Sequence, residues 1–272
     1  MITRRSALGF LAAASALPSR ALADVAPPRN EIRDSLAKRF VDAGAVGTFV
    51  GYKVDDYMII ASDTVRSGEG KLPASTFKVP NSLIAMETGV VQDPDKDVFP
   101  WDGVKRPMEA WNKDHTLRSA IAASAVPVYQ EIARRIGQER MQKYVDLFEY
   151  GNRDIGGGID QFWLTGNLRI DPIEQIDFLD RLRRKALPIS QRSQDLVCDI
   201  LPVTKVGDAV IRAKSGLVSA KGDEPSLGWM VGWAEKGGAS TVFALNVDCR
   251  EPRHVADRMT LTQACLSDIG AI

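Results

Sequence analysis

The chain has 272 residues with 35 basic and 35 acidic side chains, so its formal net charge is zero. This balance argues against nucleic acid as a partner, because binding a phosphate backbone needs an excess of Lys and Arg. The length is enough for one large domain or two closely packed subdomains.

Residues 1–23 have the pattern of an export signal. Arg4 and Arg5 form a basic start, a short apolar run follows, and small residues mark a cleavage site before Asp24. The match to a twin-arginine signal is partial. We expect a periplasmic mature chain, residues 24–272, with 32 basic and 35 acidic residues and a formal charge of −3. No later stretch is long and apolar enough to predict a membrane-spanning helix.

Strand-like and helix-like patterns follow one another along the mature chain. In order, they predict a helix at 31–42, strands at 48–54 and 57–61, a helix at 75–87, a loop at 90–115, helices at 117–123, 128–136, 139–148, 173–187 and 191–201, strands at 209–214, 226–234 and 241–247, and a closing helix at 255–269. Strands lie at both ends and helices in the middle. This order favours an α+β (mixed α/β) fold, in which one antiparallel sheet is built from both ends and flanked by helices. An all-helical subdomain is inserted at about residues 90–200 of a single domain, 24–272.

The three cysteines are an odd number and predict no disulfide framework. Cys249 and Cys265 could pair in an oxidising compartment, which the sequence leaves open. Cys198 lies among apolar residues and is predicted to be a small buried side chain. No Cys/His spacing matches a structural zinc site, so we expect no bound metal.

Ser75 and Lys78 form a Ser-x-x-Lys pattern where the helix at 75–87 is predicted to begin. Residues three apart share a helix face, so the Lys78 amine can reach the Ser75 hydroxyl. A serine hydroxyl needs a base beside it to act as a nucleophile. Neither His115 nor His254 lies in a recognisable triad setting, so a lysine base is the simpler hypothesis.

The same spacing recurs at Ser35 and Lys38, which shows that the pattern can arise by chance. On the predicted helix at 31–42 these two side chains fall on the polar side, so we expect them to be exposed.

Two later motifs accompany the first. Ser124 follows a short predicted helix, and a hydroxyl in a turn can relay a proton to a leaving group. Lys214, Ser215 and Gly216 end a predicted strand, where an amine, a hydroxyl and a flexible residue can bind a carboxylate along the strand edge. Taken singly, each motif has a plainer explanation. Ser75 and Ser124 could be helix caps, and Lys214 could simply protect a strand edge.

In order and character, Ser75-Thr76-Phe77-Lys78, Ser124-Ala125-Val126 and Lys214-Ser215-Gly216 resemble the motifs of the active-site serine penicillin-recognising enzymes. The apolar third residue of the middle motif resembles the class D, or OXA-type, β-lactamases. Tyr150-Gly151-Asn152 and Gln161-Phe162-Trp163-Leu164 strengthen this resemblance, which runs from about residue 46 to the C-terminus. One departure is Ser215, where many members have threonine, but serine keeps the hydroxyl.

The resemblance implies the penicillin-recognising serine-enzyme fold and hydrolysis of β-lactam antibiotics, which confers resistance. Ser75 would attack the ring carbonyl, and Lys78 would react with CO2 or bicarbonate to become N6-carboxylysine, a carbamate that acts as general base. A buried lysine has a lowered pKa, so a neutral amine that adds CO2 is physically coherent. Trp163 would hold the carbamate through its indole N–H, and Val126 and Leu164 would form an apolar wall. No other cofactor is implied.

The remaining roles implied by the resemblance concern the leaving group and the substrate. Ser124 would relay a proton to the ring nitrogen, and the backbone N–H groups of Ser75 and Leu217 would stabilise the oxyanion. Lys214-Ser215-Gly216 would help to bind the substrate carboxylate together with a guanidinium. Arg258 is favoured because it opens the closing helix with the family's spacing before it. The other candidates are Arg250 and Arg253.

Two other functions compete with this one. A penicillin-binding peptidase that acts on cell-wall D-Ala-D-Ala would share Lys214 and the Ser-x-x-Lys pair without efficient deacylation, but Val126 and Trp163 argue against it. A β-lactam sensor domain would be tethered to a membrane-spanning region, which the sequence does not predict. The substrate spectrum, which loops 90–115 and 216–226 are expected to control, and the oligomeric state cannot be read from the sequence.

Overall fold

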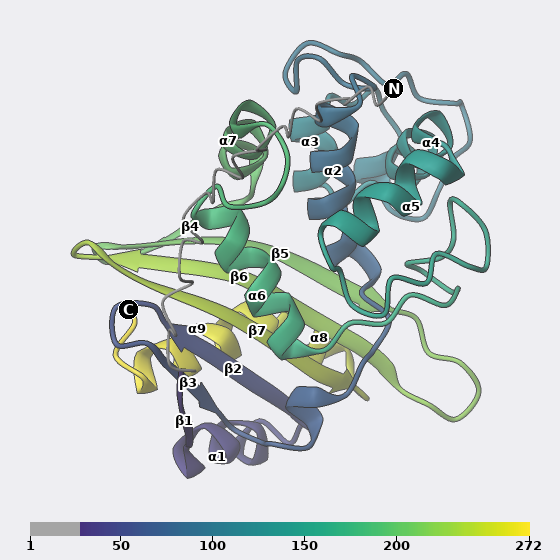
Figure 1. Cartoon of the computed structure of the whole chain (residues 1–272). Coiled ribbons are helices and arrows are strands. Elements are labelled where there is room, and N and C mark those ends of the chain that lie inside the picture. The colour runs from purple at the N-terminus through teal and green to yellow at the C-terminus, as the bar shows by residue number, and fades with distance from the viewer. Residues whose placement is uncertain (1–27) are drawn as a thin grey trace, which may run out of the picture.

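The computed structural model describes residues 28–272 (Figure 1). The predicted export signal lies outside these residues. Within them a seven-stranded sheet forms the centre of the molecule, and helices lie on both of its faces. This arrangement confirms the mixed α/β fold expected from the sequence.

The two ends of the chain meet in one sheet. The strands are β1 (Arg29–Ile32), β2 (Gly47–Lys53), β3 (Met58–Ala61), β4 (Val203–Val206), β5 (Ala209–Val218), β6 (Ser226–Lys236) and β7 (Ala239–Cys249). Their order is β1-β3-β2-β7-β6-β5-β4. The pairing of β2 with β7 joins the N-terminal and C-terminal strands, as the sequence predicted. All neighbours are antiparallel except β1 and β3, which pair in parallel. Strand β3 was predicted, whereas β1 and its parallel pairing were not.

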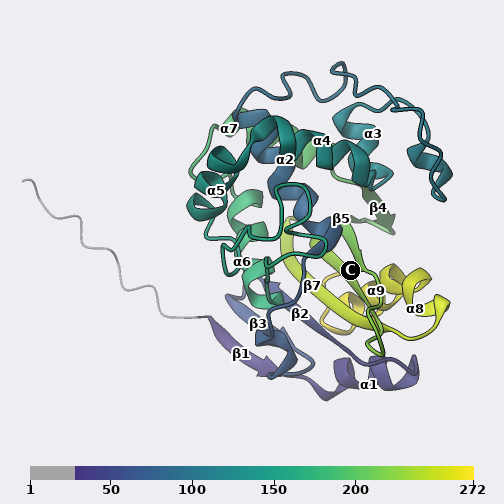
Figure 2. The same ribbon diagram turned by 90° about the vertical axis from the view of Figure 1, so that its right-hand side faces the viewer.

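Helices of two kinds surround the sheet, α-helices and short 3₁₀ helices, which are marked η. They are α1 (Asp34–Asp42), η1 (Arg66–Gly68), η2 (Ala74–Phe77), α2 (Lys78–Glu87), η3 (Glu109–Trp111), α3 (Leu117–Ala122), α4 (Val126–Ile136), α5 (Gln138–Leu147), α6 (Pro172–Arg183), α7 (Gln191–Ile200), α8 (Pro252–Ala256) and α9 (Arg258–Asp268). Figure 2 shows α2 to α7 on one side of the sheet and α1, α8 and α9 on the other. No helix among residues 28–272 is long and apolar enough to cross a membrane.

The central strands bury both of their faces. On β7, Val242 and Ala244 belong to the larger apolar core, which includes the helices from α2 to α7. The alternate residues Phe243 and Leu245 belong to a smaller core with α1 and α9. Successive side chains of a strand point to opposite faces, so this near-continuous apolar strand fits between two helical layers.

The start of the first predicted helix is wrong. Residues Arg29–Ile32 form β1, and α1 begins only at Asp34. Ile32 remains 49% exposed. Its spacing from the other apolar residues of the predicted helix therefore does not place it in the core. Backbone hydrogen bonds along the edge of β3 outweigh the local helical pattern.

The C-terminal elements also differ from expectation. The closing helix is broken at Asp257 into α8 and α9, and the short strand β4 was not predicted. Strand β5 continues to Val218, so Lys214-Ser215-Gly216 lies within it instead of at its end. Strand β4 pairs only with residues 209–212, and along 213–218 β6 is the only strand that pairs with β5 among the described residues. The motif therefore still lies on an open strand edge.

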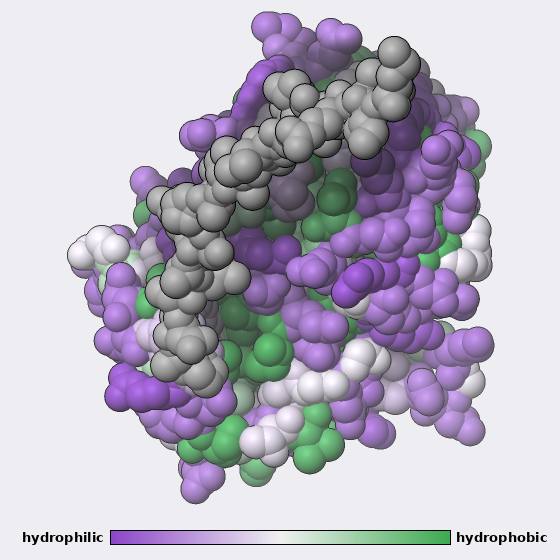
Figure 3. Space-filling model, in the orientation of Figure 1, coloured by the Kyte–Doolittle hydropathy of each residue, from purple (hydrophilic) through white to green (hydrophobic). Residues whose placement is uncertain are grey.

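The surface and the cysteines give no sign of a further structural unit. On the face seen in Figure 1, hydrophilic side chains predominate where grey atoms do not cover it, with apolar patches between them (Figure 3). Scattered apolar surface of this kind is normal for folded domains. In the described structure Cys249 and Cys265 are buried and unbonded, and Cys198 is half-buried and free.

Candidate active site

Ser75 and Lys78 lie where two helices join. Ser75 is in the tight turn of η2, and Lys78 is the first residue of α2. Lys78 Nζ donates a hydrogen bond to Ser75 Oγ at 2.8 Å, the contact that the Ser-x-x-Lys spacing predicted. Lys78 is fully buried, whereas Ser75 is partly exposed. A reachable hydroxyl with a buried amine behind it is the arrangement of a serine nucleophile and its base.

The surroundings of Lys78 favour its uncharged form. Burial lowers the pKa of Lys78 well below its usual value, and the nearby charge of Lys214 lowers it further. The ring of Tyr129 faces Nζ at 5.1 Å. An ammonium loses its hydration on burial, so burial favours the neutral amine over the charged form. The neutral amine can accept a proton.

The backbone is strained on either side of this site. Ala74 and Ser124 both adopt the left-handed conformation, with φ of 47° and 51°. Such a conformation costs an L-residue roughly 1–2 kcal/mol. The N–H of Ala74 donates to the carbonyl of Trp163 at 2.9 Å, and that of Ser124 donates to the carbonyl of Ile121 at 3.2 Å. Strain held in place by its surroundings is characteristic of functional sites.

Trp163 presents a buried donor without an acceptor. Its ring is fully buried and stacks on that of Phe77, the neighbour of Lys78, with centroids 5.5 Å apart. Its Nε1 has no hydrogen-bond partner among the described residues. Buried polar groups are normally satisfied, so this N–H indicates an acceptor that the protein itself does not supply.

The second and third motifs meet through Lys214. Lys214 Nζ donates to Ser124 Oγ at 3.0 Å and to the carbonyl of Ser215 at 2.8 Å. Ser215 Oγ lies 3.5 Å from the same nitrogen. The turn between α3 and α4 and the edge of β5 are thereby brought together with a hydroxyl and an amine in contact.

Three basic side chains gather here: Lys78 and Lys214 are buried, and Arg258 is half-buried. Burial lowers the pKa of Lys214 to about 7, and the charge of Arg258 contributes. Burial also lowers the pKa of Arg258. No carboxylate of the described chain contributes to the pKa shifts of Lys78, Lys214 or Arg258. Because buried charges are ordinarily paired, this excess of positive charge favours an anionic ligand.

Of the three candidate arginines, the structure brings Arg258 to the third motif. Its Nη1 donates to the carbonyl of Gly216. Arg253 is exposed and pairs with Glu251 at 2.7 Å, and Arg250 is exposed. Arg258, the favoured candidate, is thus the one positioned beside β5.

Gly216 allows β5 to lie close to the turn that carries Ser75. A Cβ added to Gly216 would lie 3.1 Å from the carbonyl oxygen of Pro73 and 3.2 Å from Thr76 Cγ2. The next residue, Leu217, is 41% exposed. The backbone of β5 therefore borders Ser75, and the roles predicted for Gly216 and Leu217 stay predictions.

Tyr150 and Gly151 support the site from behind. The Tyr150 ring is buried and meets the Phe77 ring edge-on, with centroids 5.6 Å apart. Gly151 has φ of 54°, and a Cβ there would lie 2.0 Å from the carbonyl oxygen of Arg169. This segment therefore contributes packing behind Phe77.

Val126 and Leu164 are both half-buried. Val126 is the first residue of α4. Leu164 directly follows Trp163 and packs against the larger core. Their role as the wall of a carbamate pocket stays a prediction.

Sequence reasoning missed two aromatic residues of the site. Tyr129 faces Lys78, and Trp229 Nε1 donates to the carbonyl of Leu72 at 2.9 Å, just before the turn that carries Ser75. Trp229 lies opposite Gly216 in the pairing of β5 with β6. A large aromatic residue across from a glycine was the available signal, but it depends on a strand register that the sequence leaves undefined.

The chance Ser-x-x-Lys pattern behaves as predicted. Ser35 and Lys38 are both exposed on α1. Lys38 Nζ contacts Asp42 Oδ1 at 2.5 Å, one helical turn away, instead of Ser35.

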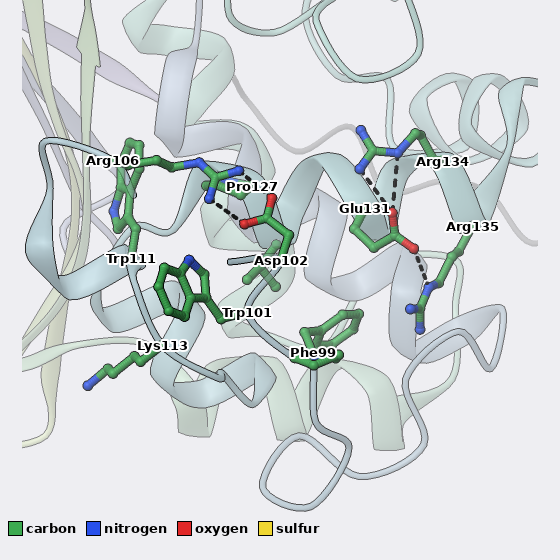
Figure 4. Close-up of a pocket in the computed structure, with 12 residues that line it drawn as sticks. Phe99, Trp101, Asp102, Arg106, Trp111, Lys113, Pro127, Glu131, Arg134 and Arg135 are labelled. Carbon is green, nitrogen blue, oxygen red and sulfur yellow. Dashed lines mark hydrogen bonds and ion pairs between the residues drawn. The ribbon is translucent and has the colours of Figure 1, made fainter. Parts of the chain in front are cut away.

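A separate pocket lies between α4 and the loop that precedes α3 (Figure 4). It measures about 280 Å³ and contains none of the predicted catalytic side chains. All of its charged groups except Lys113 form ion pairs. Asp102 pairs with Arg106 at 2.6 Å, and Glu131 pairs with Arg134 and Arg135, both at 2.9 Å. The paired charges define no ligand, and Lys113 alone does not make a binding site.

Known proteins share this architecture over most of the chain. The family model of the penicillin binding protein transpeptidase domain matches residues 63–264. β-Lactamase OXA-5 of Pseudomonas aeruginosa is 41% identical over 245 residues, which span 89% of this chain and 91% of the relative. β-Lactamase OXA-48 of Klebsiella pneumoniae is 42% identical over 227 residues, 84% of each chain.

Solved structures agree with the sequence relatives. The class D β-lactamase FUS-1 (OXA-85) of Fusobacterium nucleatum subsp. polymorphum matches with a TM-score of 0.84 at 34% identity, covering 89% of this chain and 99% of that one. The class D β-lactamase YbXI from Nostoc matches with a TM-score of 0.83 at 40% identity, covering 87% and 99%. Together with the juxtaposed serine and lysine motifs, these matches show that the chain belongs to the class D β-lactamases, hydrolases that act on the β-lactam ring.

Proposed function

We propose that this enzyme opens β-lactam antibiotics through an acyl-enzyme on Ser75, with carbamylated Lys78 as general base. The observation that carries the proposal is the fully buried Lys78 amine, hydrogen-bonded to Ser75 Oγ at 2.8 Å. A nitrogen whose pKa is lowered by burial can be neutral at physiological pH, whereas an ammonium can neither accept a proton nor add CO2.

The acylation step uses groups from all three motifs. Ser75 Oγ attacks the ring carbonyl carbon as its proton passes to the base, and the backbone N–H groups of Ser75 and Leu217 stabilise the oxyanion. The carbon–nitrogen bond then breaks, and Ser124 gives a proton to the ring nitrogen. The hydrogen bond from Lys214 Nζ to Ser124 Oγ supports this relay, because the lysine can replace the proton.

Substrate binding is assigned to the positive edge of β5. Lys214, Ser215 and Arg258 would hold the carboxylate of the antibiotic, with Gly216 allowing close approach. The support is the buried, unpaired positive charge at this edge, where no described carboxylate offsets Lys214 or Arg258.

Two features fit a carbamate on Lys78. The amine is buried and favoured in its neutral form, and the buried Nε1 of Trp163 has no acceptor among the described residues. Val126 and Leu164 would form the apolar wall. When present, the carbamate supplies an anionic base for both acylation and deacylation. CO2 or bicarbonate is its source, and we propose no metal or organic cofactor.

The Lys78 assignment is tested by comparing Lys78→Ala with Lys38→Ala, the matched control from the exposed Ser-x-x-Lys pattern. Loss of a general base should slow hydrolysis of a chromogenic cephalosporin by roughly 10²- to 10⁴-fold. Lys38→Ala should match the wild type. Mass spectrometry should show acyl-enzyme accumulating only in Lys78→Ala. Unchanged turnover in Lys78→Ala would rule out this base, and a wild type that stops after one acylation would instead indicate a peptidase.

We further propose that the signal predicted at 1–23 exports the enzyme to the periplasm, where it protects the cell. Penicillins, cephalosporins and carbapenems should be assayed with and without bicarbonate to define the spectrum. Expression of the full chain in a Gram-negative host should raise the inhibitory concentration of the hydrolysed drugs. Expression of residues 24–272 alone should not, because that protein would stay in the cytoplasm.

A further inference from the structure

The loop of residues 100–114 is closed at its base by two backbone hydrogen bonds. The N–H of Phe99 donates to the carbonyl of His115 at 2.7 Å, and the N–H of His115 donates to the carbonyl of Phe99 at 3.0 Å. Both side chains are buried, whereas most of the loop is exposed. The position of this loop therefore depends on a few internal anchors.

The imidazole of His115 is one of these anchors. It is 2% exposed. Its Nε2 lies 2.9 Å from the carbonyl oxygen of Ala110 in the loop, and its Nδ1 lies 2.9 Å from Oγ of Ser119 on α3. A carbonyl can only accept, so Nε2 carries the hydrogen and, in the neutral ring, Nδ1 accepts from the hydroxyl. The ring thus ties the loop to α3.

Trp111 extends this connection to the catalytic turn. It follows Ala110 in the chain, and its Nε1 donates to the carbonyl of Ala123 at 3.0 Å. Ala123 directly precedes Ser124, which has φ of 51° and accepts a hydrogen bond from Lys214. A left-handed serine persists only where its surroundings hold it, so a fixed Ala123 carbonyl contributes to the placement of the Ser124 hydroxyl.

We infer that His115 is a positioning residue for the proposed reaction. It fixes the loop on α3, keeps Trp111 hydrogen-bonded to Ala123, and so holds Ser124 where it can relay a proton. Its ring is occupied on both nitrogens by Ala110 and Ser119, so it acts through these contacts and not on the substrate. The inference rests on the proposed function, because its kinetic test measures hydrolysis of a β-lactam.

The test is a double-mutant cycle with His115→Leu, which removes both ring contacts, and Trp111→Phe, which removes only the indole N–H. Each should lower kcat for a chromogenic cephalosporin by roughly 3- to 10-fold, the effect of losing the one Trp111–Ala123 hydrogen bond that both variants disrupt. The double variant should be no slower than the slower single variant, because both changes break the same connection. His115→Gln, which keeps a donor for Ala110, should recover most of kcat.

The other histidine provides the matched control. His254 is also buried but lies on α8, so His254→Leu should change the melting temperature without changing kcat. A His115→Leu variant with lowered melting temperature and unchanged kcat would overturn the inference. So would a double variant whose loss in kcat equals the product of the losses in His115→Leu and Trp111→Phe.

A second measurement separates failure of this inference from failure of the proposed function. If the wild type hydrolyses no β-lactam, the proposed function fails, and amide hydrogen exchange decides the inference alone. The amides of Ser124 and Ala125, bonded to the carbonyls of Ile121 and Ala120 at 3.2 and 2.9 Å, should exchange faster in His115→Leu than in the wild type. Equal exchange in both proteins would reject the positioning role.

Discussion

At the scale of single residues, Lys78 and Lys214 are two buried amines with different partners. Lys78 contacts Ser75, and Lys214 contacts Ser124. The charge of Lys214 lowers the pKa of Lys78, since like charges at close range disfavour each other. A carbamate on Lys78 would replace this repulsion with attraction, because the modified side chain is an anion. The charge distribution therefore favours the modification that we propose.

Trp163→Phe tests what holds that carbamate. Phenylalanine keeps a ring to stack on Phe77 but removes the unpartnered N–H. A hydrogen bond to a charged group contributes about 1.5–3 kcal/mol, so CO2 affinity should fall roughly 10- to 100-fold. Activity should drop in ambient buffer and recover in added bicarbonate. Trp229→Phe is the matched control, because its N–H already has Leu72 as acceptor. A bicarbonate response of equal size in both variants would contradict the role of Trp163.

At the scale of secondary structure elements, local contacts and a single sheet built from both ends of the chain were predictable, whereas the strand order and most contacts between distant segments were not. The Ser75–Lys78 contact follows from spacing along one turn. The contact between Lys214 and Ser124 spans 90 positions, and only a resemblance to known enzymes linked the two. The last two residues of β1 were predicted as helix and β4 was missed, because the hydrogen bonds of these strands depend on neighbouring strands. Three arginines stayed candidates until the break at Asp257 fixed the start of α9 at Arg258.

The close approach of β5 to η2 can be tested with Gly216→Ala. The added methyl would lie 3.1 Å from the carbonyl oxygen of Pro73 and 3.2 Å from Trp229 Cβ. These contacts are tight, so η2 or β5 must shift by a few tenths of an ångström. Misplacement of about 1 Å can cost roughly 100-fold in rate, and we expect a loss in kcat/KM of about tenfold. Gly68→Ala, where a Cβ meets nothing within 4 Å, should leave kcat/KM unchanged. Equal kcat/KM for both variants would show that the close packing of Gly216 against η2 does not affect catalysis.

At the scale of the whole molecule, the site lies where the sheet meets the helical layer. Strand β5 supplies Lys214, η2 supplies Ser75, and the turn before α4 supplies Ser124. Lys78 on α2 and Arg258 on α9 lie nearby, and no described carboxylate is a cause of the pKa shift of Lys214 or Arg258. Burial of a charge lowers the stability of the fold, so we expect the site to reduce the free energy of unfolding. The same buried positive charge would bind an anion.

The pH dependence of stability measures this cost for Lys214. Its pKa is about 7 in the folded protein, below the ordinary value of 10.5. Between these values the unfolded chain binds more protons than the folded one, so the free energy of unfolding rises with pH, by up to about 1.4 kcal/mol per pH unit. Urea denaturation in CO2-free buffer should show the wild type gaining about 2 kcal/mol between pH 7 and 9 relative to Lys214→Met. Lys38→Met, which removes an exposed lysine, should keep the wild-type slope. If Lys214→Met also keeps that slope, Lys214 is not held with a lowered pKa and its burial carries no such cost.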